Sequence, residues 1–531
     1  MTTVLRTTDL TVRFGDPRAP GPAAVDGVSF DLAAGDTLGI VGESGSGKST
    51  TALALLRMLP PAGRITAGSV ELAGQDLAAL PEDALRALRG RRIAMVFQDP
   101  MSSLNPVLTV GRQLDEALRA HGSRLRKAER RARAVELLDL VGIPDAAGRL
   151  RDHPHRFSGG QRQRVTIALA LAHDAEVLVA DEPTTALDPT VQQQILNLLA
   201  RINRETGTAL VVISHDLGVI ARTCRRLLVM RHGRVVESGT TADLLARPEH
   251  PYTRELLAAV PRLEEPSRAA ANSTPGVQPL LTVRGLTKTY GSRRRAVTAL
   301  HGVDLDLHPG ETLGLVGESG SGKSTLARAL VGAHAPSGGS IRFRGGELDR
   351  RRPHREVQLV FQDPYSSLNP RLTAGQIVAE PLIAHRLGDR EQRAARVAEL
   401  LEQVGLDPAT ADRHPREFSG GQRQRIGIAR ALAPEPSVLI CDEPVSALDV
   451  SVQAQVIELL ARLQRELGLA VLFIAHDLAV VRQVSHRIAV MHRGRIVETG
   501  PADRVVTAPE HPYTAELLAA VPSLEPAPSA A

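Results

Sequence analysis

The chain has 531 residues, which is too long for one compact core, so two or more domains are expected. Apolar residues make up 43% and the net charge is only +5, a balance typical of a folded globular protein with a solvated surface. No apolar run reaches the roughly 18 residues of a membrane span, and the opening segment MTTVLRTTDL lacks the features of a signal peptide, so we do not expect the chain to cross a bilayer by itself.

The first informative element is a short apolar run, Thr37–Gly42, which predicts a buried strand. It leads into the loop GESGSGKST, which fits the G-x-x-x-x-G-K-[ST] pattern of phosphate-binding loops (P-loops). Glycines let the backbone wrap around phosphates, and the helix that follows presents its N-terminus to the anion. Lys48 would neutralise the β- and γ-phosphates of a nucleotide, and Ser49 would be a ligand of Mg²⁺.

The same loop occurs a second time, with Lys323 and Ser324 in the corresponding places. A chance glycine-rich loop would not recur between a predicted strand and a predicted helix. The candidate nucleotide-binding residues of the two loops are Gly42, Glu43, Ser44, Gly45, Ser46, Gly47, Lys48, Ser49 and Thr50, and Gly317, Glu318, Ser319, Gly320, Ser321, Gly322, Lys323, Ser324 and Thr325.

Two further elements follow each P-loop. Residues of about 110–150, and 375–412 in the second copy, are rich in Leu, Arg and Glu at helical spacing and predict an inserted helical subdomain. The segment FSGGQRQR then predicts a second helix N-terminus that binds an anion, with a serine hydroxyl as an extra donor. An ordinary helix cap is the alternative, but a cap does not need two glycines. The candidates are Ser158, Gly159, Gly160 and Gln161, and Ser419, Gly420, Gly421 and Gln422.

The next apolar runs, VLVADE and VLICDE, predict strands that end in two acids. Asp181 and Asp442 are suited to hold Mg²⁺, and Glu182 and Glu443 to polarise an attacking water. Two acids after a strand more often mark a solvated strand end. Their spacing from the P-loop favours the functional interpretation here.

The remaining runs complete a duplicated α/β pattern. VVISH and VLFIAH predict strands ending at His215 and His476, and alternation with helices predicts a mostly parallel sheet in each copy. The copies are offset by 275 residues at the P-loop lysines (323 − 48) and by 261 at the serines of the FSGGQRQR segments (419 − 158), so insertions fall between motifs. We expect one domain at 1–262, a Pro/Ser/Ala-rich linker at 263–279 and a second domain at 280–531.

These motifs, in this order and in duplicate, resemble two fused ATP-binding cassettes of ABC transporters. The resemblance implies an α/β fold of two tandem P-loop NTPase domains. Each would have a RecA-like core sheet, an antiparallel β subdomain and an inserted helical subdomain. ATP and Mg²⁺ are the implied cofactors, and the chain would be an ATPase.

The resemblance also gives roles to further residues: the Q-loop glutamines Gln98 and Gln362 near Mg²⁺ or water, the switch histidines His215 and His476, the D-loops that start at Ala186 and Ala447 and end at Asp188 and Asp449, and the adenine-stacking aromatics Phe14 and Tyr290. A packed aromatic is the alternative interpretation of Phe14 and Tyr290.

Three segments narrow the resemblance: QDPMSSLNP and QDPYSSLNP, HPHRFSGGQRQR and HPREFSGGQRQR, and PEHPYT-x-ELLAAVP near the end of each copy. They are similar to the ATP-binding subunits of dipeptide, oligopeptide and nickel importers.

The implied partners are two transmembrane permease subunits and an extracytoplasmic substrate-binding protein. Nucleic acid is not expected, and the location would be peripheral, on the cytoplasmic face of the membrane. A peptide, glutathione or nickel is the implied cargo. The PEHPYT segment could equally be a simple helix cap. The rival function is a tandem-cassette ATPase that acts on ribosomes, whose linker is typically longer, helical and highly charged.

Overall fold

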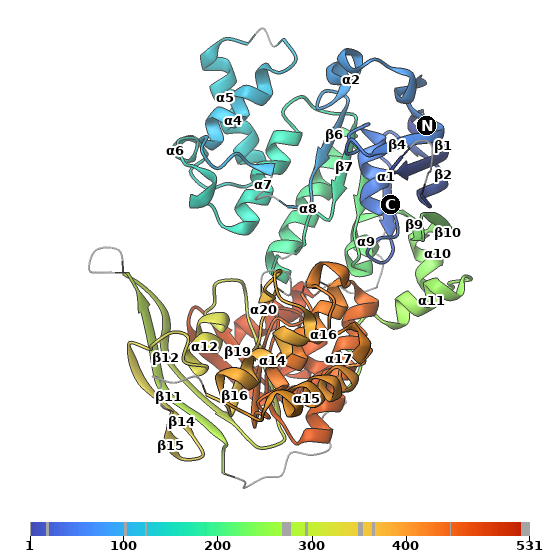
Figure 1. Ribbon diagram of the computed structural model, residues 1–531. Coiled ribbons are helices and arrows are strands. Elements are labelled where there is room, and N and C mark those ends of the chain that lie inside the picture. Colours follow the sequence, from blue (N-terminus) through green and yellow to red (C-terminus); the bar gives the residue numbers. More distant parts are fainter. Residues whose placement is uncertain are drawn as a thin grey trace. The chain divides into compact units, whose positions relative to one another are not determined.

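The computed structural model describes residues 2–16, 21–99, 103–122, 125–185, 187–267, 278–291, 296–348, 354–363, 367–446 and 448–521. Ala186, Ala447 and most of the predicted linker lie outside these ranges. The chain divides into two compact units, for the most part residues 1–258 (unit 1) and 259–521 (unit 2) (Figure 1). Within the described ranges, no helix combines the length and the apolar character needed to span a bilayer.

Unit 1 contains two sheets. The antiparallel sheet has the order β2-β1-β4-β5, formed by β1 (Thr3–Phe14), β2 (Ala23–Ala33), β4 (Gly63–Leu72) and β5 (Gln75–Asp76). The core sheet has the order β10-β9-β3-β8-β7-β6, formed by β3 (Thr37–Val41), β6 (Ile93–Val96), β7 (Val177–Asp181), β8 (Ala209–Ile213), β9 (Arg226–Arg231) and β10 (Arg234–Thr240). Only the β9–β10 pair of this sheet is antiparallel, which confirms the mostly parallel α/β fold.

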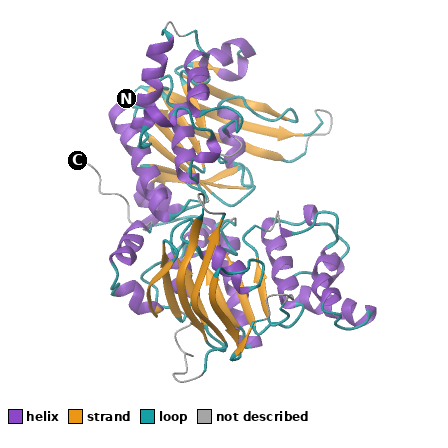
Figure 2. Ribbon diagram, turned by 90° about the vertical axis from the view of Figure 1, so that its left-hand side faces the viewer, coloured by secondary structure: helices purple, strands orange, loops and turns teal. Residues whose placement is uncertain are grey.

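The helices of unit 1 cover the core sheet or form the helical insertion (Figure 2). They are α1 (Lys48–Leu55), α2 (Glu82–Leu88), α4 (Val110–Arg119), α5 (Lys127–Leu140), α6 (Ala146–Arg149), α7 (Gly159–Ala170), α8 (Pro189–Thr206), α9 (Leu217–Thr223), α10 (Thr241–Ala246) and α11 (Pro251–Ala258), with 3-10 turns η1 (Leu77–Ala79) and η2 (Pro154–Arg156). The insertion is the predicted helical subdomain, because α4 packs on α5 and both pack on α7.

The central strands explain where the site lies. Every residue of β3, β7 and β8 is buried, as expected for apolar parallel strands covered on both faces. The strands predicted from Thr37 and from Val177 are confirmed, whereas the strand predicted at VVISH ends at Ile213, so His215 lies just beyond it. Since parallel strands end at the same edge, the P-loop, the Asp181–Glu182 pair and His215 all emerge together.

Unit 2 repeats this architecture. Its antiparallel sheet, in the order β12-β11-β14-β15, contains β11 (Leu281–Tyr290), β12 (Val297–Leu307), β14 (Gly338–Phe343) and β15 (Gly346–Glu347). Its core sheet, in the order β16-β17-β18-β13-β19-β20, contains β13 (Thr312–Val316), β16 (Val357–Val360), β17 (Val438–Asp442), β18 (Ala470–Ile474), β19 (Arg487–His492) and β20 (Arg495–Pro501).

The helices of unit 2 follow the same order as those of unit 1. They are α12 (Lys323–Leu330), α14 (Ala374–Ala384), α15 (Arg390–Gln403), α16 (Gly420–Leu432), α17 (Val450–Leu467), α18 (Leu478–Val484), α19 (Ala502–Thr507) and α20 (Pro512–Ala520), with 3-10 turns η4 (Pro408–Thr410) and η5 (Pro415–Glu417). Between β15 and β16 the described residues of unit 2 contain no counterpart of α2, and the second copy is shorter in this interval.

The second glycine of each SGGQ segment is required by packing. A Cβ built on Gly160 would lie 2.3 Å from Cγ1 of Val191, and one on Gly421 would lie 2.3 Å from Cγ1 of Val452. Real Cβ atoms do not approach so closely, so only glycine lets α7 and α16 pack against the starts of α8 and α17. This packing explains a glycine that capping alone does not require.

We expect Gly160→Ala to destabilise unit 1 by about 1–3 kcal/mol, because the added methyl overpacks the contact with Val191. The matched control is Gly159→Ala, whose Cβ would meet nothing nearer than Cδ2 of Leu187 at 3.8 Å. Calorimetric melting of both variants measures the difference. Equal melting temperatures in the two variants would contradict the packing argument.

Candidate functional site

The lysine of each P-loop is buried and lies folded against its own loop. Nζ of Lys48 donates to the carbonyl oxygens of Gly42 at 2.7 Å and Glu43 at 2.8 Å. Nζ of Lys323 donates to Gly317 at 2.6 Å and Glu318 at 2.8 Å. Both side chains are only 5% exposed. A buried ammonium held by carbonyl dipoles is well suited to accept phosphate oxygens in their place.

The helix after each P-loop begins at this lysine. Its N-cap is Gly47 in unit 1 and Gly322 in unit 2, with φ of 99° and 109°, a left-handed conformation that favours glycine. Because glycine has no side chain to cap the helix, no N-cap side chain would compete with an anion for the first N–H groups of α1 and α12. This geometry agrees with the phosphate-binding role predicted for Gly42–Thr50 and Gly317–Thr325.

A serine and an aspartate meet beside each P-loop. Oγ of Ser49 donates to Oδ1 of Asp181 at 3.1 Å, and Oγ of Ser324 to Oδ1 of Asp442 at 3.0 Å. Burial is the largest influence on Asp181 and raises its pKa to about 6, although the Ser49 hydrogen bond opposes it. Burial likewise raises the pKa of Asp442.

These oxygen donors fit Mg²⁺, a hard cation that favours carboxylate and hydroxyl ligands. Within the described ranges no group of three or more His, Cys, Asp or Glu side chains could hold a metal ion. A magnesium ion at this place would therefore depend on oxygens from bound phosphates, as is usual for Mg²⁺ in nucleotide sites.

In unit 1, Glu182 is at the centre of a hydrogen-bond network. Nε2 of Gln98 donates to its Oε2 at 2.7 Å, and Oγ1 of Thr185 donates to the same oxygen at 2.8 Å. Nδ1 of His215 lies 3.3 Å from its Oε1. Burial alone would raise the pKa of Glu182, but the hydrogen bond and positive charge of His215, with the Thr185 hydroxyl, lower it to about 2. The network therefore favours the ionised form of the Glu182 carboxylate.

The network of unit 2 is similar but looser. Nε2 of Gln362 donates to Oε2 of Glu443 at 2.7 Å, whereas Nδ1 of His476 lies 3.7 Å away. Burial opposes ionisation of Glu443, but His476, Lys323 and Gln362 outweigh it and lower its pKa. Ser446, the counterpart of Thr185, donates to the backbone oxygen of Glu443 and leaves its carboxylate with one donor fewer.

The backbone of both glutamates is in the left-handed region, with φ of 47° at Glu182 and 48° at Glu443. Such a conformation is uncommon outside glycine and costs of order 1–3 kcal/mol. It turns the chain away from the direction of the strand immediately after Asp181 and Asp442. The carboxylates of the two successive acids therefore contact different residues, although the acids are adjacent in sequence.

The signature serines cap their helices. Oγ of Ser158 accepts from the backbone N–H of Gln161 at 3.3 Å, and the Gln161 side chain accepts from the N–H of Ser158 at 3.1 Å. Ser419 and Gln422 form the same capping box. The cap orders each helix N-terminus, and the packing role of Gly160 and Gly421 adds to it. Gly159 and Gly420 occupy the first positions of α7 and α16.

The two predicted adenine-stacking aromatics end equivalent strands. Phe14 is the last residue of β1 and packs beside Gly63, where a Cβ would lie 2.7 Å from its ring. Tyr290 ends β11 with 37% of its surface exposed, and its ring meets His334 edge-on at 5.8 Å. Phe14 is thus the more packed of the two, and stacking on adenine stays a prediction for both.

The two D-loop aspartates precede the long helices α8 and α17. Asp449 caps α17 by accepting from the N–H of Val452 at 3.1 Å, and Asp188 is 7% exposed directly before Pro189. Sequence reasoning missed three residues that touch the site: Thr185, Tyr252 and Tyr513. The tyrosines belong to the repeated HPYT segment, and this repetition was the available signal.

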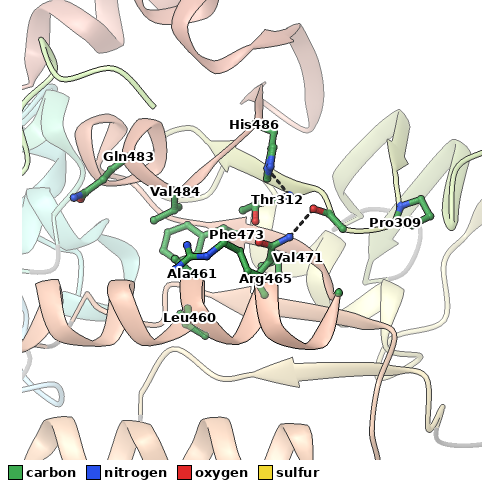
Figure 3. A pocket seen from close by; sticks show the side chains of 13 residues that line it. Pro309, Thr312, Leu460, Ala461, Arg465, Val471, Phe473, Gln483, Val484 and His486 are labelled. Atoms are coloured by element: carbon green, nitrogen blue, oxygen red, sulfur yellow. Dashed lines mark hydrogen bonds between the residues drawn. The ribbon is translucent and has the colours of Figure 1, made fainter. Parts of the chain in front are cut away.

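A separate hollow of about 310 Å³ lies in unit 2 at the opposite edge of the core sheet (Figure 3). Its lining includes Thr312, Gln464, Phe473 and His486. Thr312 begins β13, whereas the P-loop follows the end of that strand. Nδ1 of His486 accepts from the N–H of Thr312 at 3.0 Å, so these groups already serve the fold. The hollow is not part of the nucleotide site.

Comparisons with known proteins identify the family of this chain. The family model described as ABC transporter matches residues 25–185 and 300–446, and the model for the oligopeptide/dipeptide transporter C-terminal region matches 236–299 and 497–530. The glutathione import ATP-binding protein GsiA of Escherichia coli K12 is 49% identical, with 95% of this chain and 87% of that protein covered. The protein of the same name in Pectobacterium atrosepticum is 47% identical, with coverage of 95% and 87%. Among solved structures, the ATP-binding cassette MJ0796 with ADP and Pi is 32% identical, covers 42% of this chain and 98% of its own, and has a TM-score of 0.38.

We expect Glu182→Gln and Glu443→Gln, made singly, each to reduce ATP turnover by at least half while ATP still binds. An amide cannot take a proton from water, and general bases typically contribute about 10²- to 10⁴-fold to a site's rate. Glu176→Gln is the matched control, because Glu176 is partly exposed and paired with Arg92. Phosphate release by the purified chain measures turnover. Unchanged turnover in either glutamate variant would show that its site does not hydrolyse ATP.

Proposed function

Because the chain belongs to the ABC transporter family, we propose that its two cassettes power the import of glutathione or a short peptide. The chain is an ATP-binding ATPase subunit of an ABC importer. The cargo that we propose for this importer is glutathione or a short peptide. The observation that carries it is the 49% identity over 95% of this chain to a glutathione import ATP-binding protein, together with oligopeptide-type C-terminal regions in both copies. Nickel, which the sequence analysis also allowed, has less support.

In the proposed cycle, ATP phosphates take the place of the Gly42 and Glu43 carbonyls as partners of Lys48. Lys323 would act in the same way in unit 2. Backbone N–H groups at the starts of α1 and α12 would hold the phosphate oxygens. The residues that would hold Mg²⁺ are Ser49, Asp181 and Gln98 in unit 1, and Ser324, Asp442 and Gln362 in unit 2. When bound, the ion would neutralise the negative charge that develops on the phosphate oxygens.

Hydrolysis would use the ionised glutamates. Glu182 and Glu443 accept the proton of the attacking water, and Gln98 and Gln362 fix the orientation of their carboxylates. His215 and His476 would contact the γ-phosphate through the ring edge that faces away from glutamate. Phe14 and Tyr290 would stack on the adenine rings. Both units keep all these groups, which supports two hydrolytic sites rather than one.

We further propose that the signature segments Ser158–Gln161 and Ser419–Gln422 each bind phosphate oxygens of an ATP. Each signature helix has an ordered N-terminus and a capping serine, which suits it to bind a phosphate oxygen. The D-loop aspartates Asp188 and Asp449 would also contribute to ATP binding.

The importer would also contain two permease subunits and an extracytoplasmic substrate-binding protein, with this chain on the cytoplasmic face of the membrane. No described helix of the chain is long and apolar enough to span the bilayer. The ribosome-directed alternative has less support, because the oligopeptide-type C-terminal regions occur in both copies.

Affinity purification of the tagged chain from its own cells tests this function. We expect two membrane permeases to be recovered with the chain, and ATPase activity of the reconstituted complex to rise with binding protein loaded with glutathione or dipeptide. The Glu182→Gln/Glu443→Gln double variant controls for activity of other ATPases. Recovery of ribosomes without permeases would contradict an importer, and stimulation by neither cargo would contradict the proposed substrate class.

A further inference from the structure

A tyrosine from the end of each cassette contacts the P-loop. The backbone N–H of Glu43 donates to the hydroxyl of Tyr252 at 3.0 Å, across 209 residues of sequence. The N–H of Glu318 donates to the hydroxyl of Tyr513 at the same distance, across 195 residues. The two contacts occur independently in the two units. This repetition shows that the HPYT segment does more than begin a helix.

The segment is built to place this tyrosine. In unit 1 the carboxylate of Glu237 accepts from the backbone N–H of Glu249 at 2.7 Å and of His250 at 3.2 Å. Nδ1 of His250 then accepts from the N–H of Tyr252 at 3.2 Å and caps α11. The Arg231 guanidinium covers the tyrosine ring at 4.5 Å, and Tyr252 is 1% exposed.

Unit 2 reaches the same result with one different partner. Glu498 accepts from the N–H groups of Glu510 and His511, at 2.9 and 3.0 Å, and Nδ1 of His511 accepts from Tyr513 at 3.1 Å. Here the His492 ring stacks on Tyr513, with centroids 3.9 Å apart and planes 12° apart. The ring contact differs from that of unit 1, but the hydroxyl contact with the P-loop is retained.

The tyrosine and the P-loop lysine hold opposite ends of one peptide group. The amide between Gly42 and Glu43 donates its N–H to Tyr252, and its carbonyl accepts from Nζ of Lys48. The amide between Gly317 and Glu318 is held in the same way by Tyr513 and Lys323.

No residue other than glycine fits at the first position of this peptide. Gly42 has φ of 153°, and a Cβ built on it would lie 2.2 Å from the carbonyl oxygen of Met230. Gly317 has φ of 154°, and its Cβ would lie 2.1 Å from Met491 O. The carbonyl oxygens of Met230 and Met491 therefore leave no room for a side chain at the first residue of this peptide.

We propose that Tyr252 and Tyr513 are positioning residues that hold the first P-loop peptide in place when the lysine leaves it for phosphate. While the lysine is bound to the carbonyl, the lysine and the tyrosine both hold this peptide. Once the lysine turns to ATP, the tyrosine hydroxyl still accepts the hydrogen bond from its N–H. The C-terminal region of each cassette thereby sets ATP affinity without touching ATP. This inference rests on ATP binding at these P-loops.

Tyr252→Phe tests the proposal in the full chain, in a Lys323→Ala background that disables the second P-loop. Phenylalanine keeps the ring under Arg231 and removes only the hydroxyl. We expect the affinity for a fluorescent ATP analogue to fall by about 2- to 10-fold, the factor that loss of one ordinary hydrogen bond produces. Turnover at saturating ATP should change much less. Tyr513→Phe with Lys48→Ala is the reciprocal test.

Hydrogen exchange of the Glu43 amide, measured without nucleotide, gives a second readout. We expect it to accelerate in Tyr252→Phe, because the N–H loses its acceptor. The matched control is Thr208→Val, which deletes a buried hydroxyl bonded to the Ala175 carbonyl at 3.0 Å, at the amino end of β8. It should change neither the exchange nor the affinity.

Unchanged Glu43 exchange in Tyr252→Phe, or an equal loss of affinity in Thr208→Val, would overturn the proposal. So would a fall in saturated turnover with unchanged ATP affinity. Failure of the parent chain to bind nucleotide would instead contradict ATP binding, since the exchange measurement does not depend on it.

Discussion

A buried lysine ammonium at the carboxyl edge of each core sheet is the interaction on which the site depends. Carbonyl dipoles stabilise Lys48 and Lys323 but do not neutralise them. Burying a charge is costly unless an opposite charge is close. Burial lowers the pKa of Lys323, against the opposing effect of Glu443 and Asp442. A phosphate chain would satisfy this charge more completely than the loop does, so the fold is organised for an anion before any anion binds.

The sheet also places two successive acids beside each P-loop, and backbone strain separates their contacts. Asp181 ends β7 in line with the strand and reaches Ser49. Glu182 turns into the left-handed region, while its N–H still bonds to the Ile213 carbonyl at 2.9 Å. Glu443 bonds to Ile474 in the same way. The strand register thus stabilises an unfavourable φ, and the carboxylate reaches the glutamine and histidine that follow the neighbouring strands.

The two units keep their backbone geometry and differ in the side chains around it. Thr185 corresponds to Ser446, and Arg231 to His492, yet the Tyr–P-loop bond is 3.0 Å long in both. A guanidinium over a ring and a stacked imidazole both cover an aromatic face. Between the two units, the side chain that covers the ring differs, whereas the tyrosine that accepts from the P-loop N–H is the same.

Local patterns predicted most of the fold because each depends on neighbours in sequence. Thr37–Val41 is mostly apolar and leads into the loop GESGSGKST, which suffices to predict a strand followed by a P-loop. The direct partners of Glu182 were only partly accessible in this way. Gln98 and His215 were found through the resemblance to ATP-binding cassettes, whereas Thr185 carries no distinctive pattern.

Tyr252 shows where sequence reasoning ends. HPYT predicts a helix start from His250 and Pro251, which the structure confirms. Its hydroxyl, however, bonds to a backbone N–H that every non-proline residue possesses, so the partner leaves no mark in the sequence. The contact arises only because β9 lies beside β3 in the core sheet and carries the C-terminal segment past the P-loop. A side chain that recurs in both copies can therefore indicate that it makes a contact. Only the strand order identifies the group that it contacts.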